Sequence, residues 1–499
     1  MPDWLNELLP IIILLIVISF VIGRLPKVKD VNHSKAYRLR RTLNWLPLGL
    51  TYAFLYMGRY NIKVSQYAFG VMKDAGGDPL MSNTDFNIIF LAGTIVYGVS
   101  FIINGPMTDR IGGRRAILTG AGGALTANLL MGLATWSMIS NGPLSGLIYN
   151  NFVVVIAVLY VANMYFQSFG AVAIVKVNAP WFHVRERGVF GAIFGILIAL
   201  GLYFAYDWSP KVLKLLPTEW VFLTPACILA VFWVIVFFVV KNTPSEAGLK
   251  DFDTADASSG DEGPRMKVVQ VFALMLKNPV IVTIACVEFC SGFIRQAIMQ
   301  WYPSFAIQTD GALGMADGFV LSNWGMLLCC AGIIGGVVAG VISDHIFQSR
   351  RGPVAAILYA SMFIIAIVFT FLYQTPIVGI LVVLTSVCVI GVHGMLSGTA
   401  SMDFGGSRNV GVAVGIIDGF VYLGTAFMSL VYWMVLPEDK LTADGQITGP
   451  AADPDNWYTW PLALIPIALI GFLLATRLWH AKPKPGASQP SSKSEGKKT

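Results

Sequence analysis

The chain has 499 residues, of which 56% are hydrophobic and only 12% are charged, whereas an ordinary soluble protein carries about 25% charged residues. Its mean hydropathy is +0.68, which excludes a soluble enzyme and indicates an all-α protein embedded in the lipid bilayer. The six surplus positive charges are spread over loops and one tail. We therefore expect no nucleic-acid partner.

Apolar stretches of about 20 residues, long enough to cross a hydrocarbon core of roughly 30 Å, recur along the chain. Residues 8–23 come first, with an acidic start and a basic exit, and predict an extra N-terminal membrane helix; a buried or interfacial segment is the alternative. Twelve core helices follow. They are expected near residues 43–68, 86–106, 116–139, 147–175, 189–206, 219–240, 279–306, 317–343, 353–373, 376–399, 410–436 and 459–478.

Five segments follow from this pattern. They are an extra segment with a basic linker (1–41), a first six-helix bundle (42–240), a polar central loop (241–277), a second six-helix bundle (278–478) and a basic tail (479–499), which we expect to be disordered.

The positive charges predict the orientation of the chain in the membrane. Twenty-seven Lys and Arg residues lie in the connections on one side, and four lie on the other. Because cytoplasmic connections carry the excess of Lys and Arg, the central loop and the C-terminus are expected in the cytoplasm.

The two bundles share an internal repeat. The arginines within the first and seventh helices, Arg59 and Arg295, are 236 residues apart, and two similar charged loops follow the second and eighth helices at nearly the same offset. Homologous halves of this kind place a substrate site at their interface, near the middle of the membrane. The loop residues are interpreted as gating charges, with a topology signal as the alternative. They are Asp109, Arg110, Arg114, Arg115, Asp344, Arg350 and Arg351.

A polar stripe marks the first core helix, where Tyr52, Tyr56, Arg59, Lys63 and Gln66 share one face of an otherwise apolar segment. Cations within the membrane are costly and need compensation. We expect this face to line a cavity.

The matched arginines predict an anion site. Two guanidinium groups that meet across the interface would repel each other unless an anion lay between them, and a tetrahedral oxyanion fits their forked donors. The alternative is that Glu288 or Asp418 holds each arginine and merely braces the bundle.

Three further polar positions stay open between two interpretations. Asn163 and Gln167, one turn apart, could bind substrate hydroxyls or join helices. His393 could exchange a proton or form a structural hydrogen bond, and Asp418 could carry a proton or balance an arginine. Glu288, two turns from Arg295, joins them as a charge partner.

No nucleotide loop, metal-ligand cluster or nucleophile–histidine–acid set emerges from the sequence. We therefore expect no enzymatic activity, no cofactor and no metal site. The six cysteines all lie in apolar stretches and are interpreted as small core residues.

At these residues the chain resembles the organophosphate:phosphate antiporter family of the major facilitator superfamily, over residues 42–478. The resemblance rests on short motifs in both halves. They are Tyr56-Met-Gly-Arg59-Tyr-Asn61, Asn163-Met-Tyr-Phe-Gln167-Ser-Phe-Gly170, Trp181-Phe182, Arg185-Glu-Arg187-Gly188, Asn242-Thr-Pro244, Arg295 with Gln300-Trp301-Tyr-Pro303, and Ser343-Asp344 with Arg350-Arg351-Gly352.

The resemblance implies the major facilitator fold and the exchange of a phosphorylated small metabolite, of the sugar phosphate or glycerol phosphate class, for inorganic phosphate. Arg59 and Arg295 would bind the phosphoryl group and Tyr56 would assist. The chain departs from the family at Phe101, Ile198 and Ala171-Val172, which leaves the particular metabolite open. Lys63 is our candidate for the missing charge.

Two alternatives remain at this stage: a proton-coupled carrier of another organic anion, and a transport-inactive sugar-phosphate sensor. In each case we expect a monomer in a bacterial inner membrane.

Overall fold

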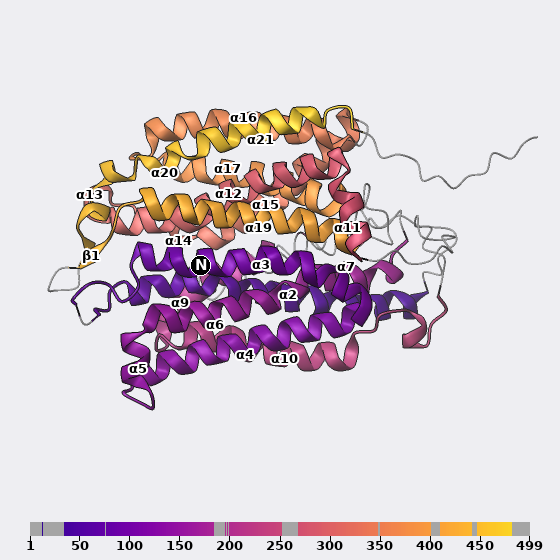
Figure 1. Ribbon diagram of the computed structural model, residues 1–499, viewed down its shortest axis with the longest axis horizontal. Helices are drawn as coiled ribbons and strands as arrows, with labels where there is room; N and C mark the ends of the chain where they lie inside the picture. The colour runs from indigo at the N-terminus through magenta and orange to yellow at the C-terminus, as the bar shows by residue number, and fades with distance from the viewer. Residues whose placement is uncertain are drawn as a thin grey trace, which may run out of the picture.

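The computed structural model of the chain describes residues 34–74, 76–183, 199–251, 268–347, 350–400, 410–441 and 447–481, with positions 12, 195 and 197. The predicted extra helix at 8–23 therefore lies outside the described residues except at position 12. Figure 1 shows the described helices running side by side along the long axis, with those up to α10 in one layer and those from α12 on in another.

The first layer begins with the longest described helix, α2. Its helices are α2 (Lys35–Phe69), α3 (Asn83–Ile111), α4 (Gly113–Ile139), α5 (Ser145–Asn150), α6 (Phe152–Gln167), α7 (Phe169–Asn178), η1 (Ala179–Trp181), η2 (Phe204–Trp208), α9 (Ser209–Leu215) and α10 (Trp220–Val239).

The second layer follows η3 (Ser245–Ala247) and α11 (Val268–Leu276). It contains α12 (Pro279–Gln308), α13 (Asp310–Leu313), α14 (Phe319–Ser322), α15 (Trp324–Val341), η4 (Ile342–Ile346), α16 (Arg351–Leu372), α17 (Val378–His393), η5 (Gly394–Ala400), α19 (Val410–Val435), η6 (Pro450–Ala452), η7 (Pro454–Trp457), α20 (Thr459–Leu462) and α21 (Leu464–Arg477). The strands β1 (Lys440–Leu441) and β2 (Ile447–Thr448) pair antiparallel, with Lys440 opposite Thr448.

The prediction of an all-α membrane protein is confirmed. Within the described part of the chain, nine helices are long and apolar enough to cross a membrane, and α15 adds a shorter apolar helix, Trp324–Gly340. Helix α2 is not among the nine although its C-terminal two-thirds are buried almost completely. Its polar stripe lowers its hydropathy, and burial inside the bundle removes the need for an apolar surface.

The internal repeat is visible in the packing of two glycines. A Cβ on Gly201 would lie 2.8 Å from the carbonyl oxygen of Ala53 on α2, and a Cβ on Gly424 would lie 1.9 Å from that of Phe289 on α12. Ala53 and Phe289 are 236 residues apart, the same offset as the two arginines. In each half, the segment that carries one of these glycines therefore contacts the backbone of the half's first helix at the equivalent point.

Candidate substrate site

Arg59 lies fully buried in the middle of α2 and donates three hydrogen bonds. Its Nε donates to Gln167 Oε1 (2.9 Å), its Nη1 to the Tyr422 hydroxyl (2.6 Å) and its Nη2 to the Tyr97 hydroxyl (2.6 Å). The rings of Tyr56 and Tyr97 each lie 4.4 Å from its guanidinium carbon. Arg59 is therefore held by an amide and by phenols from both halves.

Arg295 is buried to 6% exposure on α12, and its Nε and Nη2 have no hydrogen-bond partner among the described residues. Three tyrosines lie in electrostatic range of both arginines: Tyr56, Tyr60 and Tyr422. A buried guanidinium with empty donors is costly, because a hydrogen bond to a charged group contributes about 1.5–3 kcal/mol. Arg295 thus presents two donors that an anion could fill.

The carboxylates named as alternative partners of the arginines have other contacts. Glu288 pairs with His393, at 2.8 Å between Oε2 and Nδ1, and Asp418 accepts a hydrogen bond from Ser397. Among the described ion pairs, none joins either carboxylate to Arg59 or Arg295. Simple bracing of the arginines by carboxylates is therefore not what this structure contains.

The two arginines flank the axis that relates the halves. Tyr60 and Gln296 directly follow Arg59 and Arg295, and they are repeat equivalents with a separation of 236 residues. The Gln296 amide donates to the Tyr60 hydroxyl at 2.8 Å. Equivalent positions that touch must lie at the axis, so the arginines lie on either side of it.

An amide ladder continues from this contact along α12. Gln300 donates to Gln296 Oε1 at 3.0 Å, and the Tyr206 hydroxyl donates to Gln300 Oε1 at 3.1 Å. The ladder provides neutral donors and acceptors next to Arg295, of the kind that can bind hydroxyl groups.

Asn163 and Gln167 support Arg59 from α6. The Asn163 amide donates to the Gly58 carbonyl (2.8 Å), while Gln167 Nε2 donates to Asn163 Oδ1 (2.9 Å) and its own oxygen accepts from Arg59. Asn128 donates to the same Asn163 oxygen at 3.2 Å. In this structure both predicted residues join helices, and Gln167 orients the guanidinium.

Lys63 lies one turn beyond Arg59, fully buried. Its Nζ donates to Gln66 Oε1 (2.7 Å) and to Ser304 Oγ on α12 (2.6 Å), and it lies 4.4 Å from the Trp301 ring centroid. Lys63 therefore links α2 to α12. Tyr52 packs edge-on against Tyr56 with ring centroids 5.2 Å apart, on the other side of Arg59.

The predicted gating residues lie at the ends of helices. Asp109 forms an ion pair with Lys176 at 2.6 Å, and the Arg114 backbone N–H donates to Asn242 Oδ1 at 2.9 Å. Arg110 and Arg115 are exposed. In the second half, Arg350 Nε donates to the Phe347 carbonyl (3.2 Å) and Arg351 Nη1 to Ser343 Oγ (2.8 Å), whereas the side chain of Asp344 lies outside the described part.

Hydrogen bonds also join the halves at the end of the bundle where α2 finishes. Asn83 exchanges side-chain hydrogen bonds with Gln308 (2.9 and 3.0 Å), and its backbone N–H donates to Asp439 Oδ1 (2.8 Å). Asp207 accepts from the first free N–H groups of α15, those of Gly325 (2.7 Å) and Met326 (2.8 Å). This end of the molecule is closed.

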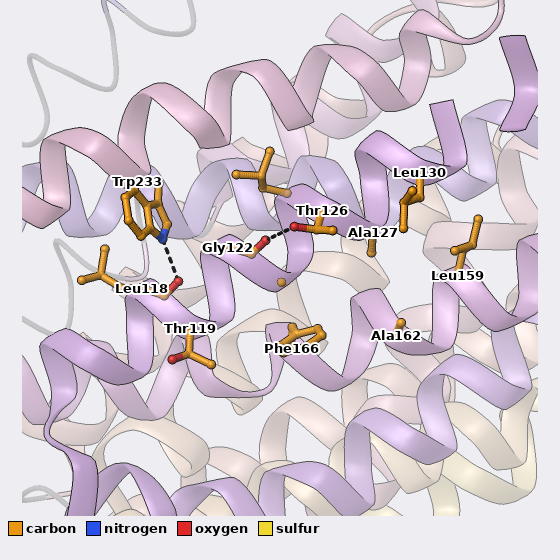
Figure 2. A pocket seen from close by; sticks show the side chains of 12 residues that line it. Leu118, Thr119, Gly122, Thr126, Ala127, Leu130, Leu159, Ala162, Phe166 and Trp233 are labelled. Atoms are coloured by element: carbon orange, nitrogen blue, oxygen red, sulfur yellow. Dashed lines mark hydrogen bonds between the residues drawn. The ribbon is translucent and has the colours of Figure 1, made fainter. Parts of the chain in front are cut away.

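A groove of about 770 Å³ lies away from the arginines, on the face formed by α4, α6 and α10 (Figure 2). Its lining residues are Leu118, Thr119, Gly122, Gly123, Leu125, Thr126, Ala127, Leu130, Leu159, Ala162, Phe166 and Trp233. None of these side chains carries a charge, so the groove has no group that would bind an oxyanion.

Sequence reasoning missed Tyr97, Tyr422 and Gln296, and it named Gln300 only as part of a family motif, without a site role. The two glutamines follow Arg295 at one and five positions and share a face of α12, a signal that was present in the sequence. The two tyrosines stand alone in apolar helices and gave no such signal. Among the described residues, no group of three or more potential metal ligands is found.

Comparison with known proteins identifies the class. The family profile described as the Major Facilitator Superfamily matches residues 48–429, so the chain belongs to this superfamily of membrane transporters. A D-xylose-proton symporter shares the fold with a TM-score of 0.58, at 16% identity and with 89% and 98% of the two chains covered. A bacterial homologue of the lysosomal transporter Spinster shares it with a TM-score of 0.62, at 12% identity and the same coverage.

Sequence relatives support the more particular resemblance to organophosphate transporters. The chain is 25% identical to the glycerol-3-phosphate transporter of Bacillus subtilis (strain 168), covering 91% of this chain and 96% of the relative. It is 24% identical to the membrane sensor protein UhpC of Escherichia coli (strain K12), covering 80% and 85%. It is also 24% identical to the phosphoglycerate transporter protein of Salmonella typhimurium, covering 83% and 87%.

Proposed function

We propose that this protein exchanges a phosphorylated small metabolite, of the sugar phosphate or glycerol phosphate class, for inorganic phosphate by alternating access. The observation that carries the proposal is the pair of buried arginines at equivalent positions, one of which has two empty donors. The names of the relatives, which include glycerol-3-phosphate and phosphoglycerate transporters, support the same substrate class.

The geometry suggests how binding would drive the exchange. A phosphoryl group placed between Arg59 and Arg295 would accept from the free donors of Arg295 and replace neutral phenol acceptors at Arg59 with charged ones, and charge-assisted hydrogen bonds are about twice as strong as neutral ones. The anion would also cancel the repulsion between the guanidinium groups. The empty carrier, in which that repulsion remains, would close its halves less readily than the loaded one.

The organic part of the substrate would lie along α12. The amides of Gln296 and Gln300 would meet its hydroxyl groups, and Lys63 would attract a second negative group from one turn beyond Arg59. Asp109, Arg114 and Arg351, with the other charged loop residues, would pair and separate as the two halves move.

We place the protein in a bacterial inner membrane as a monomer, and the charge distribution supports an orientation with the central loop and C-terminus in the cytoplasm. In that orientation the closed end of the bundle faces outward.

A sensor is the second candidate, because one relative of similar identity is named a membrane sensor protein. An antiporter and a sensor would both need the arginine pair to bind the anion. Only the antiporter would move substrate across the membrane.

The test is uptake of labelled phosphate into proteoliposomes preloaded with unlabelled phosphate, with competing metabolites outside. The proposal predicts rapid exchange that glycerol phosphates or hexose phosphates inhibit competitively. This exchange should not require an imposed proton gradient. Binding of phosphate without exchange would instead favour the sensor, and uptake that occurs only with a proton gradient would favour a proton-coupled carrier.

A further inference from the structure

A buried acid–base pair lies beside the anion site, and among the described ion pairs it forms none with the arginines. Glu288 is fully buried on α12, its Oε2 lies 2.8 Å from Nδ1 of His393, and its Oε1 has no hydrogen-bond partner in the described part of the chain. The His393 side chain is 22% exposed. His393 is the last residue of α17, where the helix changes to the wider π-helical turn η5, and such turns often occur at functional sites.

The ionisable groups around the pair lie on α12, α16 and α19. Helix α12 contributes Arg295, two turns from Glu288, and Cys290; α19 contributes Asp418; and α16 contributes Tyr359, whose hydroxyl donates to the Val287 carbonyl instead. Helix α15, which packs against α17, carries no charged residue and only Cys329 and Cys330 as titratable groups, and α21 carries only Arg477, at its end. No cation other than Arg295 therefore lies near Glu288 among the described residues.

The charges at the centre of the bundle do not balance a doubly charged substrate. Arg59 and Arg295 lie there with the carboxylates Glu288 and Asp418, whereas Lys63 interacts with a buried carboxylate of its own, Asp439. With neutral His393 these charges cancel, so a bound dianion would leave two negative charges in a medium that disfavours them. One added proton halves that excess of negative charge.

We propose that Glu288 and His393 form a proton-binding site that takes up one proton when a dianion binds between the arginines and loses it when the anion leaves. The proton comes from water through the partly exposed histidine. It adds to the imidazole, so that neutral imidazole and carboxylate become imidazolium and carboxylate, with no other bond formed or broken. The inference rests on the proposed function, and it adds that this site makes the exchange pH-dependent.

Glu288→Gln tests the proposal because it mimics the charge of the protonated pair. We expect phosphate KM in proteoliposomes to equal the wild-type value at pH 6 and to be lower than wild type at pH 8. The expected difference is on the order of tenfold, since it removes a unit charge two helical turns, about 10.5 Å, from Arg295. Phosphate itself titrates in this pH range, and it does so equally in the assays of both proteins. The ratio of the variant KM to the wild-type KM therefore isolates the effect of the pair.

Two variants make the comparison specific. Glu288→Asp should keep the pH dependence of the wild type, and Glu219→Gln, which neutralises a buried acid before α10 and away from the pair, should behave as wild type at both pH values. A Glu288→Gln variant whose KM is raised or unchanged at pH 8 would overturn the proposal, because a merely structural role weakens binding at every pH. Absence of exchange in the wild type would instead overturn the proposed function.

A second measurement does not depend on the folding of Glu288→Gln. The titration of His393 can be followed by NMR of ¹³C-labelled histidine in the wild-type protein, with the signal assigned by comparison with His393→Gln. Saturating phosphate should move the titration midpoint of His393 to higher pH. An identical midpoint with and without phosphate would contradict the proposal.

Discussion

Arg59 and Arg295 occupy equivalent positions, yet their donors are used differently. Arg59 donates to Gln167, Tyr97 and Tyr422, whereas two nitrogens of Arg295 find no acceptor within the described residues. All the acceptors of Arg59 are neutral, so a phosphoryl oxygen could replace them with a gain in free energy. We therefore interpret the asymmetry as that of an empty site whose first contact is Arg295.

For transport, the planar arrangement of donors on the Arg59 guanidinium matters more than its positive charge. Arg59→Lys keeps the positive charge but loses the planar donors that reach Gln167, Tyr97 and Tyr422, so we expect the initial rate of phosphate exchange to fall at least about tenfold, as for the loss of a bidentate charged contact. The rate is measured in proteoliposomes at equal protein density. Full activity of the lysine variant would contradict a guanidinium-specific site.

The Tyr422 hydroxyl competes with the substrate for Arg59. Tyr422→Phe leaves Nη1 of Arg59 without an acceptor in the empty protein, which costs about 1–3 kcal/mol, so we expect the phosphate KM to fall severalfold. Tyr432→Phe is the matched control, because that hydroxyl lies on the same helix but donates to Trp460. An increase in KM for Tyr422→Phe would show that the phenol binds the substrate instead.

Sequence was sufficient to single out the two arginines as candidates, because a cation within an apolar helix is rare and costly; their role in binding stays a prediction. It could not select Tyr97 or Tyr422, since tyrosine is common in membrane helices and the contact with Arg59 depends on how α2, α3 and α19 pack. It also offered Asp418 and Glu288 as partners of the arginines, but a one-dimensional pattern could not show that Ser397 and His393 lie nearer.

At the scale of elements, the predicted helices agree with the observed ones to within a few residues at many ends, and the differences have local causes. The predicted fourth helix, 147–175, corresponds to the end of α5, to α6 and to most of α7, with breaks at Asn151 and Ser168. The Ser168 hydroxyl donates to the Tyr165 carbonyl at 2.6 Å and thus competes with the helical hydrogen bonds. The predicted eighth helix, 317–343, begins properly only at Trp324, where Asp207 caps it from the other half.

Close packing of helix backbones predicts a stability difference between two glycines. In Gly424→Ala the new methyl group would overlap the Phe289 carbonyl, so we expect a loss of about 1–3 kcal/mol. Gly336→Ala on α15 is the control, because nothing lies within 4 Å of its Cβ position. Thermal unfolding in detergent, followed by tryptophan fluorescence, should show a lower Tm only for Gly424→Ala; equal Tm values would refute the backbone contact.

At the scale of the whole molecule, hydrogen bonds close one end of the bundle. Asp439, which follows α19, accepts from the backbone of Asn83 at the start of α3, and Asn83 also bonds to Gln308. Burial raises the pKa of Asp439 from its ordinary 3.8 to about 6, against the opposing effect of the Asn83 hydrogen bond. Because the ionised Asp439 carboxylate is costly in the closed state, its ionisation favours opening of this end of the bundle.

The closed end should therefore open more easily as the pH rises. Because the pKa is raised in the closed state, the stabilisation by protonation is complete below about pH 3.8 and is lost as the pH rises through about 6. Over this pH range the free energy of the closed state, relative to the open state, changes by about 3 kcal/mol.

We expect a cysteine in place of Ser304, in a cysteine-free background, to react faster with a polar thiol reagent at pH 7.5 than at pH 5, after correction for thiol ionisation. Asp439→Asn should abolish the increase, whereas Asp317→Asn, in an exposed loop, should retain it. An increase that persists in Asp439→Asn would rule out this carboxyl group as its source.

The repeat offset allowed the arrangement of the halves to be predicted before the structure was known. Equal spacing of Arg59 and Arg295 placed them near a common axis, and the contact between Tyr60 and Gln296 agrees with that placement. The closed state of one end could not be predicted, because Asn83, Gln308 and Asp439 are brought together only by packing. The division of the chain at 240 and 278 stays a prediction.

The central claim is that Arg59 and Arg295 hold one phosphoryl group between them. The most direct test is phosphate self-exchange in proteoliposomes containing the wild type, Arg59→Ala or Arg295→Ala, with equilibrium phosphate binding measured on the same proteins. Exchange and binding should be lost in both variants and present in the wild type. Retention of binding in either alanine variant at the wild-type affinity would contradict the claim.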